Sequence, residues 1–67
     1  MTDRPTYLAY ETFLSVAECK AAKSSTLGDA YANAKWDYDN CGGHARAARA
    51  KAVMENISAE ITERTNA

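Results

Sequence analysis

The chain has 67 residues, a quarter of them charged, and a formal net charge of −1. A chain this short holds one domain, and its near-neutral charge gives no general attraction for nucleic acid or anionic membranes. No apolar run approaches the roughly 20 residues of a membrane span and no signal segment is visible, so we expect a cytoplasmic protein without membrane contact.

The first predicted element is a helix over about residues 4–23, because its apolar side chains recur at alternating spacings of three and four. Residues 6–14 also contain many side chains that favour strands, and an extended segment there would make the fold α+β. Ser15 followed by Glu18 forms a capping box that would instead start a shorter helix. No second strand exists to pair with residues 6–14, so we favour the long helix. Its predicted apolar face consists of Tyr7, Tyr10, Leu14, Ala17 and Ala21.

A second helix is predicted over about residues 27–40. Thr26 is the expected N-cap, with Asp29 in a box-like relation three residues on. The pair Gly42 and Gly43 is expected to end the helix, because glycine accepts the left-handed backbone that a helix terminus commonly needs. The predicted apolar face consists of Leu27, Tyr31, Ala34, Tyr38 and Cys41.

The third predicted helix, over about residues 44–62, is rich in alanine and has high intrinsic helix propensity. Its first half is lined by alanine, so a neighbouring helix could approach closely there. Three amphipathic helices with short connections predict an all-α, up-down-up three-helix bundle that forms a single domain over residues 1–67. The predicted apolar face consists of Ala47, Ala50, Met54, Ile57 and Ile61.

The charges around the second turn run against local preference. Asp37 and Asp39 lie at the end of the second helix, where the helix dipole disfavours acids. His44 and Arg46 lie at the start of the third helix, where it disfavours bases. An antiparallel hairpin would bring the two sets together so that they offset each other. Alternatively, one or both sets face a partner.

Trp36 lies about half a turn away from the predicted apolar face of its helix, among polar residues. It either packs against a second neighbour in the bundle or serves as an exposed anchor of the kind found at interface hot spots. The candidate partner-binding residues are Asp29, Asn33, Trp36, Asp37, Asp39, Arg46 and Arg49.

The sequence carries no motif for metal binding or catalysis. Asp37, Asp39 and Gly42 match three positions of a calcium-binding loop, but Ala48 stands where the bidentate Glu is needed. One histidine and two cysteines are too few for a stable zinc site. No nucleophile and base, carboxylate pair or phosphate-binding loop has the required spacing. We therefore expect no metal, no cofactor and no enzymatic activity.

These observations favour a non-enzymatic protein-interaction module, an inhibitor or adaptor that docks onto a larger protein or complex. Small helical chains of this kind are common among phage or mobile-element proteins that block a host system, such as anti-CRISPR inhibitors. That expectation comes from size and simplicity, not from any resemblance in residues. One alternative is a small nucleic-acid-binding or regulatory protein that uses the basic start of the third helix. The other is a homo-oligomeric assembly protein, or homodimer, that associates through the alanine-lined seam.

Overall fold

The computed structural model describes residues 10–40 and 43–66, and in these two ranges 93% of positions are helical and no strand occurs. The predicted all-α class is therefore confirmed. The elements are the 3-10 helix η1 (Tyr10–Leu14) and the α-helices α1 (Val16–Ala21), α2 (Ser24–Asn40) and α3 (His44–Asn66).

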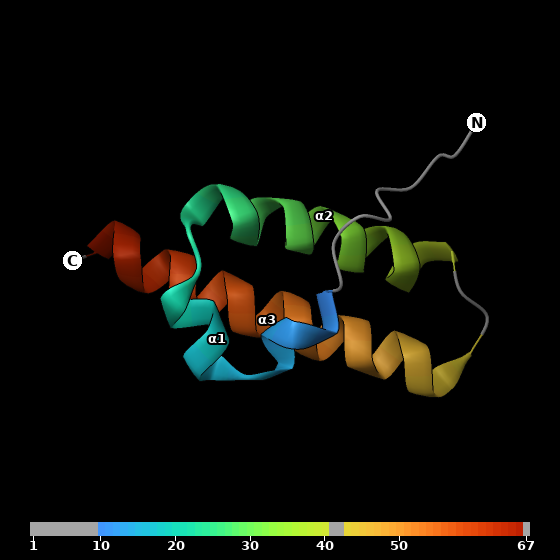
Figure 1. The fold of residues 1–67 in the computed structure, drawn as a ribbon. Helices are drawn as coiled ribbons and strands as arrows, with labels where there is room; N and C mark the ends of the chain where they lie inside the picture. Colours follow the sequence, from blue (N-terminus) through green and yellow to red (C-terminus); the bar gives the residue numbers. More distant parts are fainter. Residues whose placement is uncertain (1–9, 41–42, 67) are drawn as a thin grey trace.

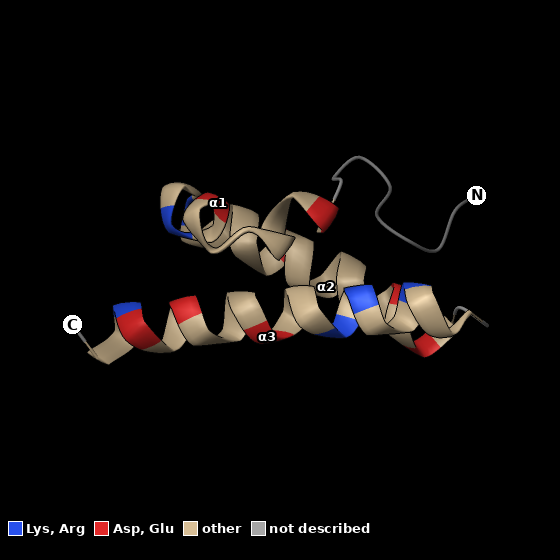
Figure 2. Ribbon diagram, turned by 90° about the horizontal axis from the view of Figure 1, so that it is seen from below, with Lys and Arg blue, Asp and Glu red and all other residues tan. Residues whose placement is uncertain are grey.

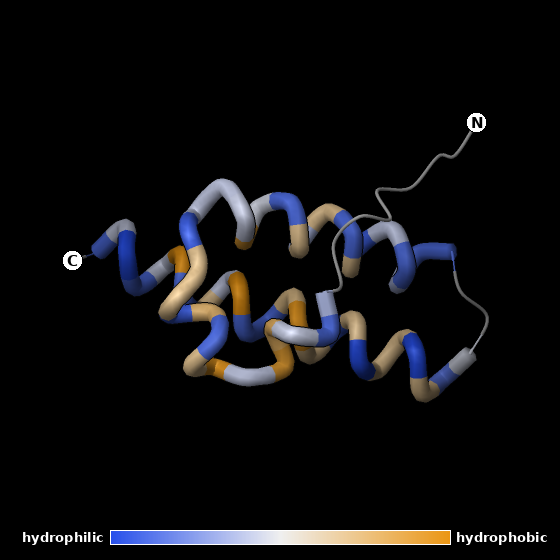
Figure 3. Tube along the Cα trace, viewed as in Figure 1, coloured by the Kyte–Doolittle hydropathy of each residue, from blue (hydrophilic) through white to orange (hydrophobic). Residues whose placement is uncertain are grey.

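The elements form two unequal layers. Helices α2 and α3 run antiparallel along each other, and η1 and α1 pack on one side of this pair, mainly against α3 (Figure 1). In the orthogonal view, α3 is a nearly straight rod with charged residues along its length (Figure 2). Hydrophilic positions occur along the whole of α2 and α3, while hydrophobic positions are most frequent around η1, α1 and the middle of α3 (Figure 3).

The prediction of one long helix over residues 4–23 is wrong for residues 10–23, the part of this segment that the structure describes. The chain forms η1, breaks at Ser15 and starts a separate short helix, α1. The alternative of a shorter helix capped by Ser15 is confirmed, because the Ser15 hydroxyl accepts a hydrogen bond from the Glu18 amide at 3.4 Å. The second bond of a capping box does not form, because the Ser15 amide donates to the Thr12 carbonyl. The extended alternative fails over residues 10–14, which are helical, while residues 4–9 lie outside the described ranges.

The break at Ser15 has a packing reason. The tighter 3-10 helix places residues three apart above one another, so Tyr10 and Phe13 are both buried. After the break, α1 turns Cys19 inward, while Leu14 stays 44% exposed. One continuous α-helix could not present these three buried side chains to the same core.

Helix α2 starts three residues earlier than predicted. Its first hydrogen bond runs from the Leu27 amide to the Lys23 carbonyl at 3.0 Å, which leaves Thr26 inside the helix and not at its N-cap. The predicted C-terminal end, Asn40, is confirmed.

Helix α3 starts at His44 as predicted and continues four residues beyond position 62, to Asn66. Gly43 precedes it, accepts a hydrogen bond from the Ala47 amide at 3.0 Å and has no positive φ. Gly42 lies outside the described residues. The extra turn at the C-terminal end holds Arg64, whose contacts are described below.

The core gathers where the three helices and η1 meet, and α2 turns a different face toward it than predicted. Tyr31 and Tyr38 are 38% and 43% exposed, while Ala30 and Asp37 are buried in their place. Cys41 lies outside the described residues. The nine buried apolar residues are Tyr10, Phe13, Cys19, Leu27, Ala30, Ala34, Ala50, Val53 and Ile57.

The predicted face of α3 is largely confirmed. Ala50 and Ile57 are fully buried, Met54 packs against the core, and Ile61 at its end is 37% exposed. Within the alanine-lined seam, Ala50 is fully buried, Ala47 is half-buried and Ala48 is exposed, so the chain itself covers only part of the seam.

Candidate functional site

The charges expected to meet across the α2–α3 turn do so around Asp37. Its carboxylate is 2% exposed and accepts hydrogen bonds from the Tyr10 hydroxyl and, at 3.1 Å, from the Arg46 Nε. The Arg46 side chain remains 52% exposed. The prediction that an acid and a base offset each other here is confirmed for this pair.

Tyr10 keeps its proton in this cluster. Burial, followed by the hydrogen bond to Asp37 and the charge of that carboxylate, raises the pKa of Tyr10 to about 12. The hydrogen bond from Arg46 to Asp37 also raises the pKa of Arg46. At neutral pH a neutral phenol and a guanidinium therefore share one buried carboxylate. This arrangement joins η1 and α3 to α2.

The other charges near this turn do not meet in the same way. Asp39 pairs with Lys35 on its own helix at 3.1 Å, and both side chains are more than half exposed. His44 and Arg49 are also exposed. Neither makes an ion pair with another described residue.

Two of the candidate partner-binding residues need correction. Asn33 is fully buried and Asp37 nearly so, because α2 is rotated to turn both toward the inside of the fold. They offer no surface to a partner. Trp36 is half-buried, which leaves part of its ring accessible, while Asp29 is exposed.

The exposed side of α2 carries Tyr31 and Tyr38, which the sequence had placed in the core, and the half-buried Trp36. Together with two exposed acids of the same helix they are called here the α2 aromatic surface, which spans two flanks of α2. The interior of the fold holds Ala30 and Ala34 from the same helix. A close packing of α2 on α3 leaves no room for larger rings between them. The α2 aromatic surface consists of Asp29, Tyr31, Trp36, Tyr38 and Asp39.

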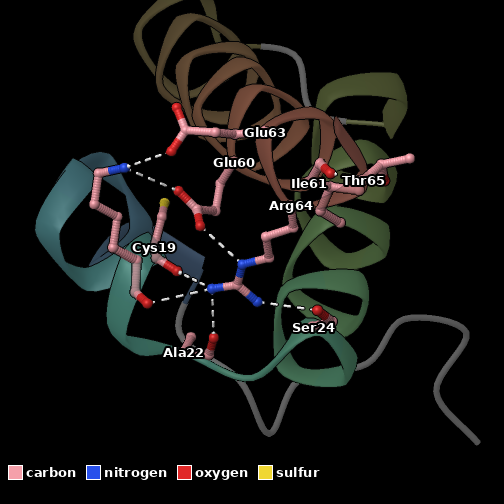
Figure 4. Close-up of polar contacts among 9 residues, drawn as sticks. Cys19, Ala22, Ser24, Glu60, Ile61, Glu63, Arg64 and Thr65 are labelled. Atoms are coloured by element: carbon pink, nitrogen blue, oxygen red, sulfur yellow. Dashed lines mark hydrogen bonds and ion pairs between the residues drawn. The ribbon is translucent and has the colours of Figure 1, made fainter. Parts of the chain in front are cut away.

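A second polar cluster, unforeseen from the sequence, surrounds Arg64 near the C-terminal end of α3 (Figure 4). Its Nη2 donates hydrogen bonds to the carbonyls of Cys19, Lys20 and Ala22 at 3.0, 3.3 and 2.8 Å. They lie at the C-terminal end of α1, where a helix runs out of backbone donors, and the Cys19 carbonyl also accepts a hydrogen bond from the Ala22 amide at 3.3 Å. The Arg64 Nη1 donates to the Ser24 hydroxyl at 3.0 Å.

Glu60 fixes the orientation of Arg64. It accepts from the Arg64 Nε at 2.8 Å, and this bond lowers the pKa of Glu60. Lys20 reaches across from α1 to Glu60 and Glu63 at 3.3 and 3.1 Å, which raises the pKa of Lys20. Burial raises the pKa of the Cys19 thiol, so this cysteine is a poor nucleophile. The cluster therefore attaches α1 to α3.

An open groove runs along the side of α3 that η1 and α1 leave uncovered. It has a volume of about 910 Å³ and is lined by α3 and by Tyr31 of α2. A smaller hollow beside it, between Gly28 and Ile61, reaches down to the buried Ile57. The principal lining residues on α3 are Lys51, Met54, Glu55, Ser58, Thr62 and Glu63.

Among residues 10–40 and 43–66, no three side chains able to ligate a metal come together, and no helix combines the length and apolar character needed to cross a bilayer. Comparison with protein-family models, curated protein sequences and solved structures finds no match for this chain. What the chain does is therefore argued from its surfaces alone.

Proposed function

We propose that this chain is a non-enzymatic protein-interaction module of the cytoplasm, an inhibitor or adaptor that docks onto a larger protein or complex through the α2 aromatic surface. The observation that carries the proposal is the placement of the rings. Tyr31 and Tyr38 are exposed and Trp36 half-exposed, while alanines fill the interior beside them. Tyrosine and tryptophan are the residues most enriched at interface hot spots.

The position of these rings has a cost that docking would offset. A domain of this size has little apolar surface to bury, and each large side chain left in water forgoes about 1.5–3 kcal/mol of stabilisation. Tyr31 and Tyr38 lie on one flank of α2 and Trp36 on the other, so a partner lying along the helix would cover all three.

The charges of the surface indicate the kind of partner. Asp29 and Asp39 both belong to it, and Lys35 between them is paired with Asp39. The partner site would therefore offer apolar pockets for the rings with basic residues beside them. A small phage or mobile-element inhibitor of a host system, such as an anti-CRISPR, is the class of protein that this proposal includes.

Nucleic-acid binding has less support. Arg46 already binds the buried Asp37 through its Nε, so part of its charge is offset within the fold. Arg49 and Lys51 are the other exposed basic residues of the first half of α3, and so few cations give little affinity for nucleic acid.

The test compares surface variants with a matched control. Tyr38→Ala and Trp36→Ala are expected to lose a partner captured from host lysate by the wild-type chain, whereas Val16→Ala, on the exposed side of α1, retains it. With the partner purified, each hot-spot substitution should weaken binding by about 2 kcal/mol, roughly 30-fold in dissociation constant.

Circular dichroism distinguishes lost binding from lost folding. Tyr38→Ala should keep the wild-type helical content, because the ring it removes is 43% exposed. If Tyr38→Ala and Trp36→Ala are folded and bind the captured partner as tightly as Val16→Ala does, the proposed surface is wrong.

A further inference from the structure

The groove along α3 is separate from most of the α2 aromatic surface and has a charge pattern of its own. Lys51 lines one end, with Glu55 one turn from it, and Glu63 lies near the other end, where the lining finishes at Asn66. Ser58 and Thr62 between them are short side chains that let another backbone come close. From Lys51 to Glu63 the groove is about 18 Å long, at 1.5 Å per residue.

The charges at the two ends are available for a partner. Lys51 and Glu55 are exposed and make no ion pair or hydrogen bond with another described residue. Glu63 contacts Lys20 through one carboxylate oxygen, and its side chain is 72% exposed. A helix lying in the groove would therefore need an acid beside Lys51 and a base beside Glu63.

We propose that the groove is filled by α3 of a second copy of this chain, running antiparallel. We place the twofold axis at the height of Ile57 along α3. Residue 51 of each copy then lies opposite residue 63 of the other copy, so two Lys51–Glu63 pairs form. The same axis places Glu55 of each copy opposite Ala59 of the other copy, a small residue. The same surface of α3 is therefore used by both copies, which is the isologous contact that a twofold dimer requires.

The charge pattern also selects the direction. A parallel second copy would set Lys51 against Lys51 and Glu63 against Glu63, and like charges at an interface are destabilising. In the antiparallel arrangement, one helix places an acid beside Lys51 and a base beside Glu63.

The size of the surface sets the expected strength. The described chain exposes 4344 Å², so a standard interface of about 800 Å² on each partner would cover roughly a fifth of it. The groove uses one face of one helix and the edge of α2, which places it at the small end of that range. We expect a reversible dimer with a dissociation constant of about 1–100 μM.

The dimer goes beyond the proposed function. Pairing through α3 would give an assembly that presents Trp36 and Tyr38 of both copies, while Tyr31, which lines the groove, is covered in the dimer. Two linked contacts hold a partner more tightly than one. The alanine-lined seam is a different part of α3, because Ala47 and Ala50 do not line the groove.

The experiment is sedimentation equilibrium of the full chain from about 1 to 500 μM, a range that brackets the expected dissociation constant. Lys51→Glu and Glu63→Lys should each weaken the dimer at least tenfold. The double variant with both substitutions restores the two pairs in reverse order and should recover most of that loss. Lys23→Glu makes the same charge change outside the groove and should sediment like the wild type.

Rescue by the double variant is the decisive readout, because a general loss of structure cannot produce it. A wild-type chain that stays monomeric throughout would overturn the proposal. So would a dimer that none of the three charge variants changes. These results do not depend on the proposed function: Tyr38→Ala should lose the larger partner without changing sedimentation, and Lys51→Glu should change sedimentation without losing that partner.

Discussion

Replacing Arg64 by alanine should destabilise the fold strongly, because this half-buried side chain of α3 holds the end of α1. Its guanidinium makes hydrogen bonds to Glu60, to the Ser24 hydroxyl and to the carbonyls of Cys19, Lys20 and Ala22. Helix α1 has six residues, far below the length at which an isolated helix is stable in water. Its end therefore depends on this side chain.

The magnitude follows from the partly buried bonds. The bonds to Cys19 and Ala22 are part-buried, and a hydrogen bond from a charged donor contributes about 1.5–3 kcal/mol. Water can replace part of this, because the Arg64 side chain is 28% exposed. We expect Arg64→Ala to lower the free energy of unfolding by about 2–3 kcal/mol, a large share of the roughly 3–10 kcal/mol expected for a chain of this length.

Urea unfolding followed by circular dichroism measures the effect. Arg64→Lys keeps the charge beside Glu60, but one ammonium cannot reach the carbonyls and the Ser24 hydroxyl together, so it should recover less than half of the loss. Arg49→Ala removes an exposed arginine that pairs with no other described residue and should change stability by less than about 0.5 kcal/mol. If Arg64→Ala is no more destabilising than Arg49→Ala, the attachment of α1 does not depend on this side chain.

Two further predictions concern η1. The pKa of Tyr10 is about 12 in the folded chain against an ordinary value of 10.0, so the stabilisation from its neutral form is present below pH 10 and is lost as the pH rises toward 12. Tyr10→Phe should be less stable than the wild type at neutral pH by about 1–3 kcal/mol, because Asp37 loses a hydrogen-bond donor. Between pH 10 and 12 the urea midpoint of this variant should fall less steeply than that of the wild type, and equal slopes for the two proteins would contradict this. Asn56 donates hydrogen bonds to the carbonyls of Phe13 and Leu14 at 3.0 and 3.1 Å. Asn56→Ala should cost about 1–2 kcal/mol and Asn56→Asp more, because a carboxylate cannot donate and repels both carbonyls; an aspartate variant as stable as the wild type would refute the role of these bonds.

The elements whose signals are local could be predicted from the sequence. Helix α3 follows from its alanine content and from Ala50, Met54 and Ile57 at helical spacing. The face of α2 could not be read the same way. Its large rings suggested a stripe through Tyr31 and Tyr38, but the close approach of α2 and α3 favours small residues between them, and the rings stay outside.

Long-range contacts account for the remaining errors. The break at Ser15 had a local signal in the capping box, but the choice between one helix and two depends on where Tyr10 and Phe13 meet the core. Nothing near Arg64 indicates that it binds the end of α1, because its partners lie 40 to 45 residues away along the chain.

The Arg64 cluster has a consequence for biosynthesis. The ribosome translates residues 16–24 at least 40 residues before Arg64. Helix α1 is therefore synthesised before the side chain that binds its C-terminal carbonyls. The paired α2 and α3 can assemble from neighbouring sequence, but the attachment of α1 must wait until the last turn of α3 has been translated. A stalled chain lacking that turn would carry α1 without this attachment and open to proteases.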